Sequence, residues 1–196
     1  IMNKLVRMAT LVLILANGTA LSAEPGVEYS TADSAQVLTD LKDIYVRFKV
    51  KVFGLARIMG RFDRLRGSMI SDANGGAADV HMHIDVDSVN TNHEERDDYL
   101  RGPTFFAAKQ HPHIIFSGSC LYRTKDGTRH IVGDLSLRGV TRRVIFEVQP
   151  LGATDDKGVA GYQATTTIRR SEFGLNTLKH IVSDEVEIVV AMNVGT

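Results

Sequence analysis

Apolar and polar residues alternate along most of the chain after residue 40. This two-residue period is typical of strands that bury one face and expose the other. In 44–52, for example, apolar side chains occupy the even positions, and polar or charged side chains occupy the odd ones. Residues 61–70 follow the pattern less regularly. The pattern is clear in segments 44–52, 80–87, 114–122, 131–137, 144–148, 160–168 and 186–194.

Short turn signals separate these segments. Asn74-Gly75-Gly76, Asp126-Gly127 and Arg138-Gly139 are typical of tight hairpins, and residues 151–158 are expected to form a longer loop. The chain is therefore expected to be all-β, with about eight antiparallel strands. A sheet of this size closes as a barrel or splits into a sandwich, and the unbroken series of hairpins favours the barrel. The pattern alone leaves open whether the interior is packed or hollow.

One charged segment interrupts the β pattern. Residues 91–101 are predicted to form a short helix, because Thr91 and Glu94 have the spacing of a capping box. Gly102-Pro103 ends it. The acidic residues of this helix are expected to face solvent. Its apolar stripe is too narrow for a core helix, so we expect it to lie across one end of the barrel, near the mouth.

The first 23 residues differ from the rest. A basic start with Lys4 and Arg7 precedes the apolar run 8–16, and small residues follow up to Ala23. This order is typical of a secretory signal peptide, with cleavage expected after Ala23 and Ala20 as the second choice. The expected domains are therefore a signal peptide over 1–23 and a barrel over 24–196.

Charge and cysteine content narrow the function. Lys and Arg together number 23, as do Asp and Glu, so the chain has no net field that would attract nucleic acid. Cys120 is the single cysteine, which excludes an internal disulfide. Because it lies on an apolar strand face, we expect a buried, inert thiol.

The motifs of familiar catalytic and metal sites are missing from the sequence. His81 and His83 have a spacing that can chelate zinc, but they lie on the polar face of their strand, and nothing nominates a third ligand. His111 and His113 flank a proline at the entry to a strand. We therefore expect no metal, no cofactor and no catalytic residue.

The sequence does not decide between two roles for a pair of arginines in the predicted helix. At the mouth of an apolar barrel, Arg96 and Arg101 would either grip the polar head of a ligand or tie the helix to the rim. Phe105 and Phe106 follow directly, and they are either a gate for a hydrocarbon tail or a plug for the core.

Four blocks of the sequence resemble one family. TNHEERDDYLRGPTFFAAKQHPHIIF at 91–116 is similar to the main block of the YceI-like family, which comprises bacterial polyisoprenoid-binding proteins with a lipocalin-like barrel. VRFKVKVFGLARIMGRFDRLRG at 46–67, GDLSLRGVTRRV at 133–144 and IRRSEFGL at 168–175 resemble further blocks, in the same order. The chain departs from the family at Val52, where histidine is frequent, at Ala107, where aspartate is frequent, at His111, where tyrosine is frequent, and at Glu172, where aspartate is usual. If the histidine binds a head group in relatives, this chain is expected to bind its ligand differently or less tightly.

The resemblance implies a non-enzymatic periplasmic protein that binds, transports or stores an isoprenoid or similar amphiphilic lipid. It leaves room for peripheral membrane contact during lipid exchange, and for a homodimer. The alternatives are an enzyme or a metal or redox accessory acting on a quinone-type lipid, and a stress-response interaction module. The expected ligand-binding residues are Phe48, Val50, Ile84, Val86, Arg96, Arg101, Phe105, Phe106, Ile114, Phe116, Leu135, Phe146, Ile168, Ile188 and Val190.

Overall fold

The computed structural model describes residues 37–71, 78–123, 128–151 and 161–193. Residues 1–33 are a unit separate from 34–196, and only the second unit contains described residues. The predicted signal peptide, the turns predicted at 74–76 and 126–127, and the side chain of Cys120 lie outside what the structure describes.

The described elements follow the chain as alternating strands and short connections, with one α-helix between β5 and β6. The bounds are β1 Val37–Val52, β2 Ala56–Phe62, β3 Leu65–Ser71, β4 Ala78–Asp85, η1 Val86–Ser88, β5 Val89–Asn90, α1 Glu94–Arg101, β6 His113–Arg123, β7 Arg129–Leu137, β8 Val140–Leu151, β9 Gly161–Arg169, η2 Arg170–Phe173 and β10 Val182–Asn193.

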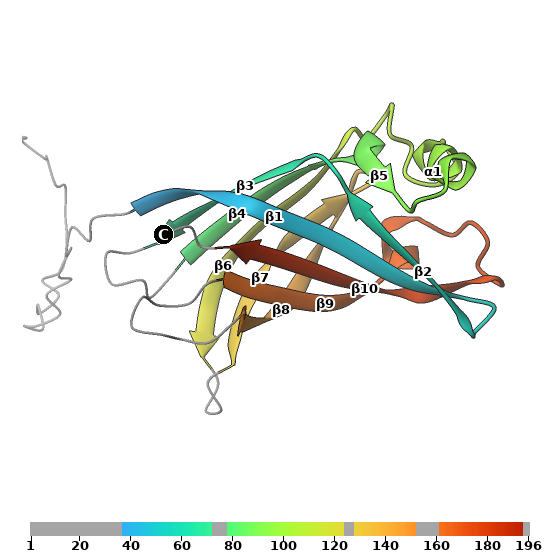
Figure 1. The fold of residues 1–196 in the computed structure, drawn as a ribbon. Coiled ribbons are helices and arrows are strands. Elements are labelled where there is room, and N and C mark those ends of the chain that lie inside the picture. The colour runs from blue at the N-terminus through green and yellow to red at the C-terminus, as the bar shows by residue number, and fades with distance from the viewer. Residues whose placement is uncertain (1–36, 72–77, 124–127, 152–160, 194–196) are drawn as a thin grey trace, which may run out of the picture. The chain divides into compact units, whose positions relative to one another are not determined.

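All described strands belong to one antiparallel sheet, in the order β10-β9-β8-β7-β6-β4-β3-β1-β2-β5. β1 also pairs with β10, from Lys42 opposite Asn193 to Val52 opposite Val182. This second pairing curls the sheet into a barrel (Figure 1). The prediction of an all-β antiparallel barrel with one short helix is confirmed.

The strand count differs from the predicted eight, since ten strands are described. The strand predicted at 61–70 is interrupted: β3 pairs with the first part of β1 and β2 pairs with the last part. Between them the backbone turns to other partners, because Asp63 N donates to Ser88 O (3.1 Å) and Arg64 O accepts from Asp85 N (3.0 Å). The additional strand β5 has two residues and pairs with β2.

Glycines make room for two aromatic rings inside the barrel. Gly118 and Gly133 lie opposite each other on β6 and β7, and the Phe116 ring covers both. Gly60 lies opposite Phe48 on β2 and β1, and the Phe48 ring covers it. Each ring therefore occupies space next to the wall that a side chain at the glycine position would otherwise fill.

The barrel wall changes where β8 meets β9. These strands pair only from Glu147 opposite Thr165 to Leu151 opposite Gly161. Beyond that stretch η2 contacts both β8 and β10, and its Phe173 is fully buried. η2 and the loop that follows it therefore complete this end of the barrel.

The helix starts later than predicted. α1 begins at Glu94 with His93 as its N-cap, whose side chain accepts a hydrogen bond from Arg96 N. The predicted capping box between Thr91 and Glu94 is wrong, because the Thr91 hydroxyl donates to the carboxylate of Asp97 instead. Asp97 also accepts from Thr91 N (2.9 Å) and is buried, so this acid does not face solvent as expected.

We find no helix among the described residues that combines the length and apolar character needed to cross a membrane.

We expect Gly133→Ala to lower the free energy of unfolding by about 1–3 kcal/mol. The new methyl group would lie 2.4 Å from Ser117 O and 2.5 Å from Gly118 Cα, and backbone atoms within a paired sheet cannot move aside easily. Urea denaturation measures the change. Gly60→Ala is the matched comparison, because its methyl group would meet the end of the Phe48 side chain at 2.2 Å. That ring can swing into the interior, so a smaller loss is expected. Equal losses in the two variants would contradict this account.

Candidate functional site

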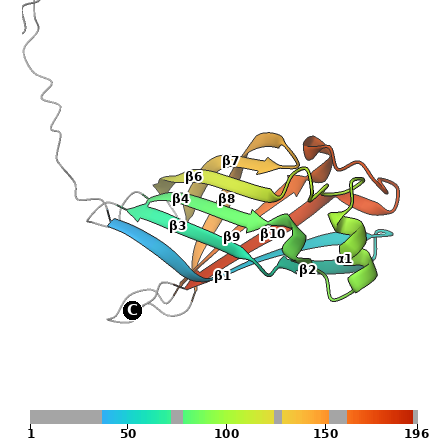
Figure 2. The ribbon, with the colours of Figure 1, turned by 90° about the horizontal axis from the view of Figure 1, so that it is seen from above.

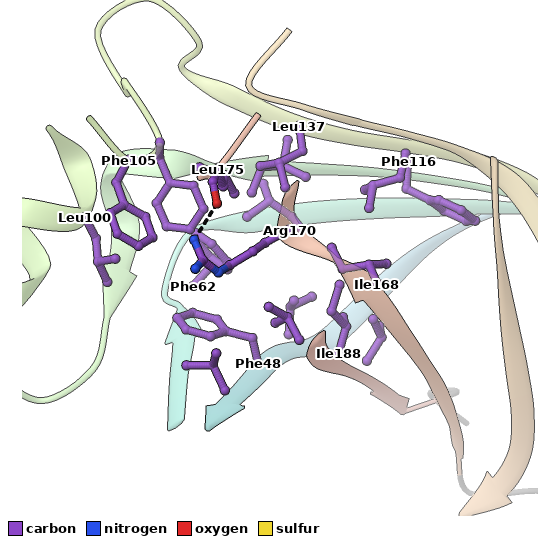
Figure 3. Close-up of a pocket in the computed structure, with 18 of the residues that line it drawn as sticks. Phe48, Phe62, Leu100, Phe105, Phe116, Leu137, Ile168, Arg170, Leu175 and Ile188 are labelled. Carbon is purple, nitrogen blue, oxygen red and sulfur yellow. Dashed lines mark hydrogen bonds between the residues drawn. The ribbon is translucent and has the colours of Figure 1, made fainter. Parts of the chain in front are cut away.

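The interior of the barrel contains an apolar cavity of about 290 Å³. Its volume is close to the lower end of the range for small-molecule sites. It runs along the inward faces of the strands and reaches α1 and the loop before β10 (Figure 3). The lining consists of apolar side chains together with Tyr99, Arg96 and Arg170.

All of the predicted ligand-binding residues line this cavity except Val86 and Arg101. Alternation accounts for the agreement, because inward positions on paired strands share one surface. Whether these residues bind a ligand stays a prediction. Residues that line the cavity but were not predicted include Val46, Phe62, Met82, Leu100, Ile131, Leu137, Ala164, Leu175 and Val186.

Val86 was wrongly placed on the cavity wall. The predicted strand extends to residue 87, but β4 ends at Asp85, and Val86 begins the 3-10 helix η1. Its backbone N–H donates to Pro112 O (2.9 Å). The side chain is almost completely buried in the core and does not line the cavity. Because β4 has ended, the alternation of inward and outward side chains no longer applies at this residue.

Arg101 does not line the cavity, and its contacts are those of a rim tie, the second of the two roles that the sequence left open. Nε donates to Asp87 O (2.8 Å), and Nη2 donates to Val89 O (3.0 Å). Nη1 forms an ion pair with Asp98 at 2.7 Å. These bonds attach the end of α1 to the η1–β5 segment, so the arginine is used for structure and does not reach the lining.

Arg96 does line the cavity. Nε donates to the Thr91 hydroxyl (2.8 Å) and Nη2 donates to Thr91 O (2.8 Å). These bonds orient the guanidinium group, while Nη1 makes no hydrogen bond with a described residue. Of the two arginines considered from the sequence, only Arg96 lines the cavity.

Five aromatic rings lead from the surface into the cavity. Neighbouring rings have centroids 5.8–6.1 Å apart and meet at tilted or edge-to-face angles, which are favourable geometries. All five line the cavity. In order, the rings are Tyr99, Phe105, Phe106, Phe62 and Phe48.

Two lining residues mark where the cavity meets solvent. Tyr99 on α1 is 45% exposed, and Leu178 in the loop before β10 is 43% exposed. Figures 1 and 2 place α1 and this loop at the same end of the barrel. The mouth of the cavity is therefore bordered by α1 and by the loop 174–181, and Phe105 and Phe106 lie just inside it.

Arg170 is a cavity residue that the sequence did not single out. It is 4% exposed, and burial lowers the pKa of its guanidinium group from the ordinary value, while nearby Asp184 opposes this shift. Its hydrogen bonds go to backbone carbonyls of the loop after η2 and of the start of β10 (Figure 3). These acceptors are Leu175 O, Thr177 O at 2.8 Å, Val182 O at 2.9 Å and Ser183 O at 2.9 Å. The only available signal was its position in the segment IRRSEFGL.

Asp184 in β10 is joined to η2 by two hydrogen bonds. Ser171 donates to its carboxylate through both its hydroxyl (2.8 Å) and its backbone N–H (2.9 Å). The hydroxyl bond is the main reason that the pKa of Asp184 lies below its ordinary value. Because the pKa of Asp184 is lower in the folded protein than in the unfolded chain, its hydrogen bonds with Ser171 stabilise the fold at pH values above the pKa of the unfolded chain. This stabilisation is lost as the pH falls through the pKa of the folded protein.

The comparisons with known proteins agree with this geometry. The sequence profile of the YceI-like domain matches residues 38–194. The chain belongs to the YceI-like family. Among relatives, a UPF0312 protein of Pectobacterium carotovorum subsp. carotovorum (strain PC1) is 34% identical over 153 residues, covering 76% of this chain and 79% of that protein. A UPF0312 protein of Yersinia pseudotuberculosis serotype O:3 (strain YPIII) is 32% identical over 186 residues, covering 90% of this chain and 96% of that protein.

Solved structures show the same YceI-like fold. BcnA of Burkholderia cenocepacia has a TM-score of 0.68 at 23% identity, covering 78% of this chain and 96% of that chain. A polyisoprenoid binding domain from Saccharophagus degradans has a TM-score of 0.54 at 18% identity, covering 82% of this chain and 97% of that chain. At these identities the likeness concerns the fold alone.

The histidines of this YceI-like chain lie outside the cavity. His81 Nδ1 is 3.1 Å from the Ser117 hydroxyl, and His113 Nδ1 is 3.1 Å from the Asp85 carboxylate. The rings of His83 and His113 are 5.8 Å apart. Across the described ranges, we find no group of three or more His, Cys, Asp or Glu side chains placed to hold a metal ion. The expectation of no metal site stays a prediction.

We expect Arg170→Met to lower the free energy of unfolding by about 3 kcal/mol or more, at roughly 1 kcal/mol for each carbonyl left without its donor. Arg170→Lys should be intermediate, because an ammonium group cannot reproduce the fork of donors. Urea denaturation measures the loss. Amide hydrogen exchange in 174–183 should accelerate in both variants. Unchanged exchange in this segment would show that Arg170 does not hold it.

Proposed function

We propose that this protein binds a long-chain amphiphilic lipid of the isoprenoid type, without catalysis, and carries or stores it. The observation that carries the proposal is the cavity itself. Its wall is apolar along the barrel, and it opens to solvent beside Tyr99 and Leu178. An apolar chain enclosed there leaves water, which is the main driving force for binding.

The aromatic path supports an unsaturated or ring-bearing ligand. Neighbouring rings meet at tilted or edge-to-face angles along the path from Tyr99 at the surface to Phe48 inside. Such a surface contacts flat, branched isoprenoid units closely, and it tolerates sliding because no single contact is directional. The polyisoprenoid binding domain from Saccharophagus degradans, which shares the fold, is consistent with this ligand class.

The polar end of the ligand is assigned to Arg96. Nη1 of Arg96 has no hydrogen-bond partner among the described residues, and the side chain lines the cavity near its mouth. Arg170 also lines the cavity, but it already donates to four carbonyl groups. A phenol, quinone carbonyl, amide or phosphate would accept a hydrogen bond from Arg96.

We also propose that residues 1–23 act as a signal peptide cleaved after Ala23, and that the mature chain works in the periplasm. The basic start, the apolar run 8–16 and the small residues before Glu24 support this. Lipid exchange would take place by peripheral contact with a membrane. A homodimer stays a prediction that no observation favours or opposes.

Lipid extraction followed by mass spectrometry tests the proposal. We expect purified wild-type protein to carry an isoprenoid or similar amphiphile, and Ala164→Phe to carry several-fold less, because its larger side chain points into the cavity. Thr167→Phe is the matched control, since Thr167 lies on the same strand with its side chain exposed, and it should retain the wild-type amount.

A wild-type protein that is free of lipid, or an Ala164→Phe variant with full lipid content, would contradict the proposal. Thermal denaturation of all three proteins shows whether the Ala164→Phe variant is folded when its lipid content is measured.

Replacing the two arginines separates head-group binding from support of the helix. Arg96→Met should reduce lipid retention by about tenfold, the effect of one lost hydrogen bond to a buried polar group. Arg101→Met should instead lower thermal stability and change retention little at a temperature where the variant is folded. A fluorescent isoprenoid competed against bound lipid measures retention. The reverse order of effects would assign the head group elsewhere.

A further inference from the structure

The outer face of the β1–β2 hairpin is strongly basic. Its outward positions alternate with the inward positions that line the cavity. Met59 is the one uncharged residue among them, and it is exposed. We call this face the basic ribbon, and its residues are Arg47, Lys49, Lys51, Arg57, Met59 and Arg61.

Two pairs of like charges lie directly opposite each other on the basic ribbon. Arg47 is paired with Arg61, and Lys51 is paired with Arg57. Like charges opposite each other on antiparallel strands destabilise the sheet. Arg61 has Asp63 as an ion-pair partner, but Arg47, Lys51 and Arg57 have no ion pair with any described residue. The basic ribbon thus presents cations that folding alone does not favour.

The tip of the hairpin is apolar and strained. Phe53 is 72% exposed and Leu55 is 92% exposed. Phe53 has a φ of 50°, followed by Gly54 at 71°. A positive φ is natural for glycine or asparagine but is an outlier for a bulky aromatic residue. A backbone outlier that points an apolar side chain into solvent indicates a role outside the fold.

The loop before β10 repeats this feature beside the tip. Leu178 has a φ of 56° and is half-exposed, and it is followed by Lys179 and His180, both exposed. Phe53 N donates to Ile181 O (2.8 Å), so the hairpin tip and this loop are adjacent. In the segments 51–57 and 176–180, every ionisable side chain is basic.

The same surface leads into the cavity. Val52 and Ile58 from the hairpin, and Leu178, Ile181 and Val182 from the loop side, all line it. An apolar ligand that leaves beside Leu178 therefore emerges next to the exposed tip, with the basic ribbon on one side.

We propose that the tip of Phe53 and Leu55 inserts into the surface of a membrane that contains anionic phospholipids, with the basic ribbon contacting their phosphate groups. This inference rests on the proposed lipid-binding function, and it names the surface through which lipid is exchanged. An apolar protrusion flanked by cations matches a bilayer surface, where acyl chains lie beneath a layer of phosphates. A nucleic acid would match the cations but not the exposed Leu55.

The nearby acidic groups are consistent with one orientation of docking. Glu187 pairs with Lys49 (2.7 Å), and Asp184 accepts hydrogen bonds from Ser171, so both are engaged by neighbours. The exposed acids of α1, Glu94, Glu95 and Asp98, lie at the same end of the barrel. Figure 1 shows α1 above and the hairpin tip below, so docking by the hairpin keeps the acidic helix away from an anionic surface.

Vesicle co-sedimentation tests the tip. With vesicles of equal parts phosphatidylcholine and phosphatidylglycerol, we expect Phe53→Asn combined with Leu55→Ser to weaken binding about tenfold or more. Asparagine suits a positive φ, so this variant should unfold at the same temperature as wild type or higher. Ile145→Thr is the matched control, because Ile145 is an exposed apolar residue on β8, and it should bind as wild type does.

A second variant tests the basic ribbon. Lys51→Gln combined with Arg57→Gln should weaken binding to the mixed vesicles by about fivefold per cation removed. It should bring binding close to that of wild type on pure phosphatidylcholine, and relief of repulsion should preserve or raise thermal stability. Loss in the charge variant with none in the tip variant would overturn the proposal and favour an acidic protein or nucleic acid. Equal binding in all variants would overturn it too.

Lipid content is measured on the same preparations. Both variants should carry the wild-type amount of lipid, because none of the four replaced residues lines the cavity. Vesicle binding without bound lipid would contradict the proposed function alone, and bound lipid without vesicle binding would contradict this inference alone.

Discussion

The hydrogen-bonded pairing of β1 with β10 is the interaction on which the rest of the structure depends. β1 uses one edge for β10 and the other for β3 and then β2, so a single long strand joins the two ends of the sheet. Once the sheet curls, alternate side chains of each strand must point inward together. The apolar face that the sequence repeats along the chain becomes one continuous inner wall.

The inner wall does not fill the barrel, and two of its large side chains lie against glycines. Phe116 covers Gly118 and Gly133, and Phe48 covers Gly60. Each ring takes the place of side chains that the glycines lack. The result is a cavity that retains the apolar character of a core while leaving room for an apolar chain.

Buried polar groups hold the end of the barrel at which the cavity opens. Arg170 gathers the carbonyl groups of the segment leading into β10, and Asp97 gathers donors at the start of α1. A charge inside an apolar region is costly unless its hydrogen bonds are satisfied, so both residues define one arrangement of the mouth. The hairpin tip differs, since its positive-φ Phe53 and its paired cations oppose local stability. Hydrogen bonds of buried charged groups thus stabilise the mouth of the cavity, whereas the exposed hairpin contains features that oppose local stability.

The sequence by itself determined the strands, the short helix, the all-β barrel and most of the cavity lining, because alternation assigns each residue to one of two faces over a whole strand. It could not place Val86, which follows the end of β4, since a chain that leaves the sheet no longer alternates. It could not separate Arg96 from Arg101, because their roles depend on which carbonyl groups the η1–β5 segment brings within reach. Arg170 and the nearness of Phe53 to the loop before β10 were decided only by the tertiary structure. Phe53 and Ile181 are far apart in sequence. The carbonyl groups around Arg170 are close to it in sequence, but they meet it only through the fold of the loop after η2, and a repeating pattern predicts neither contact.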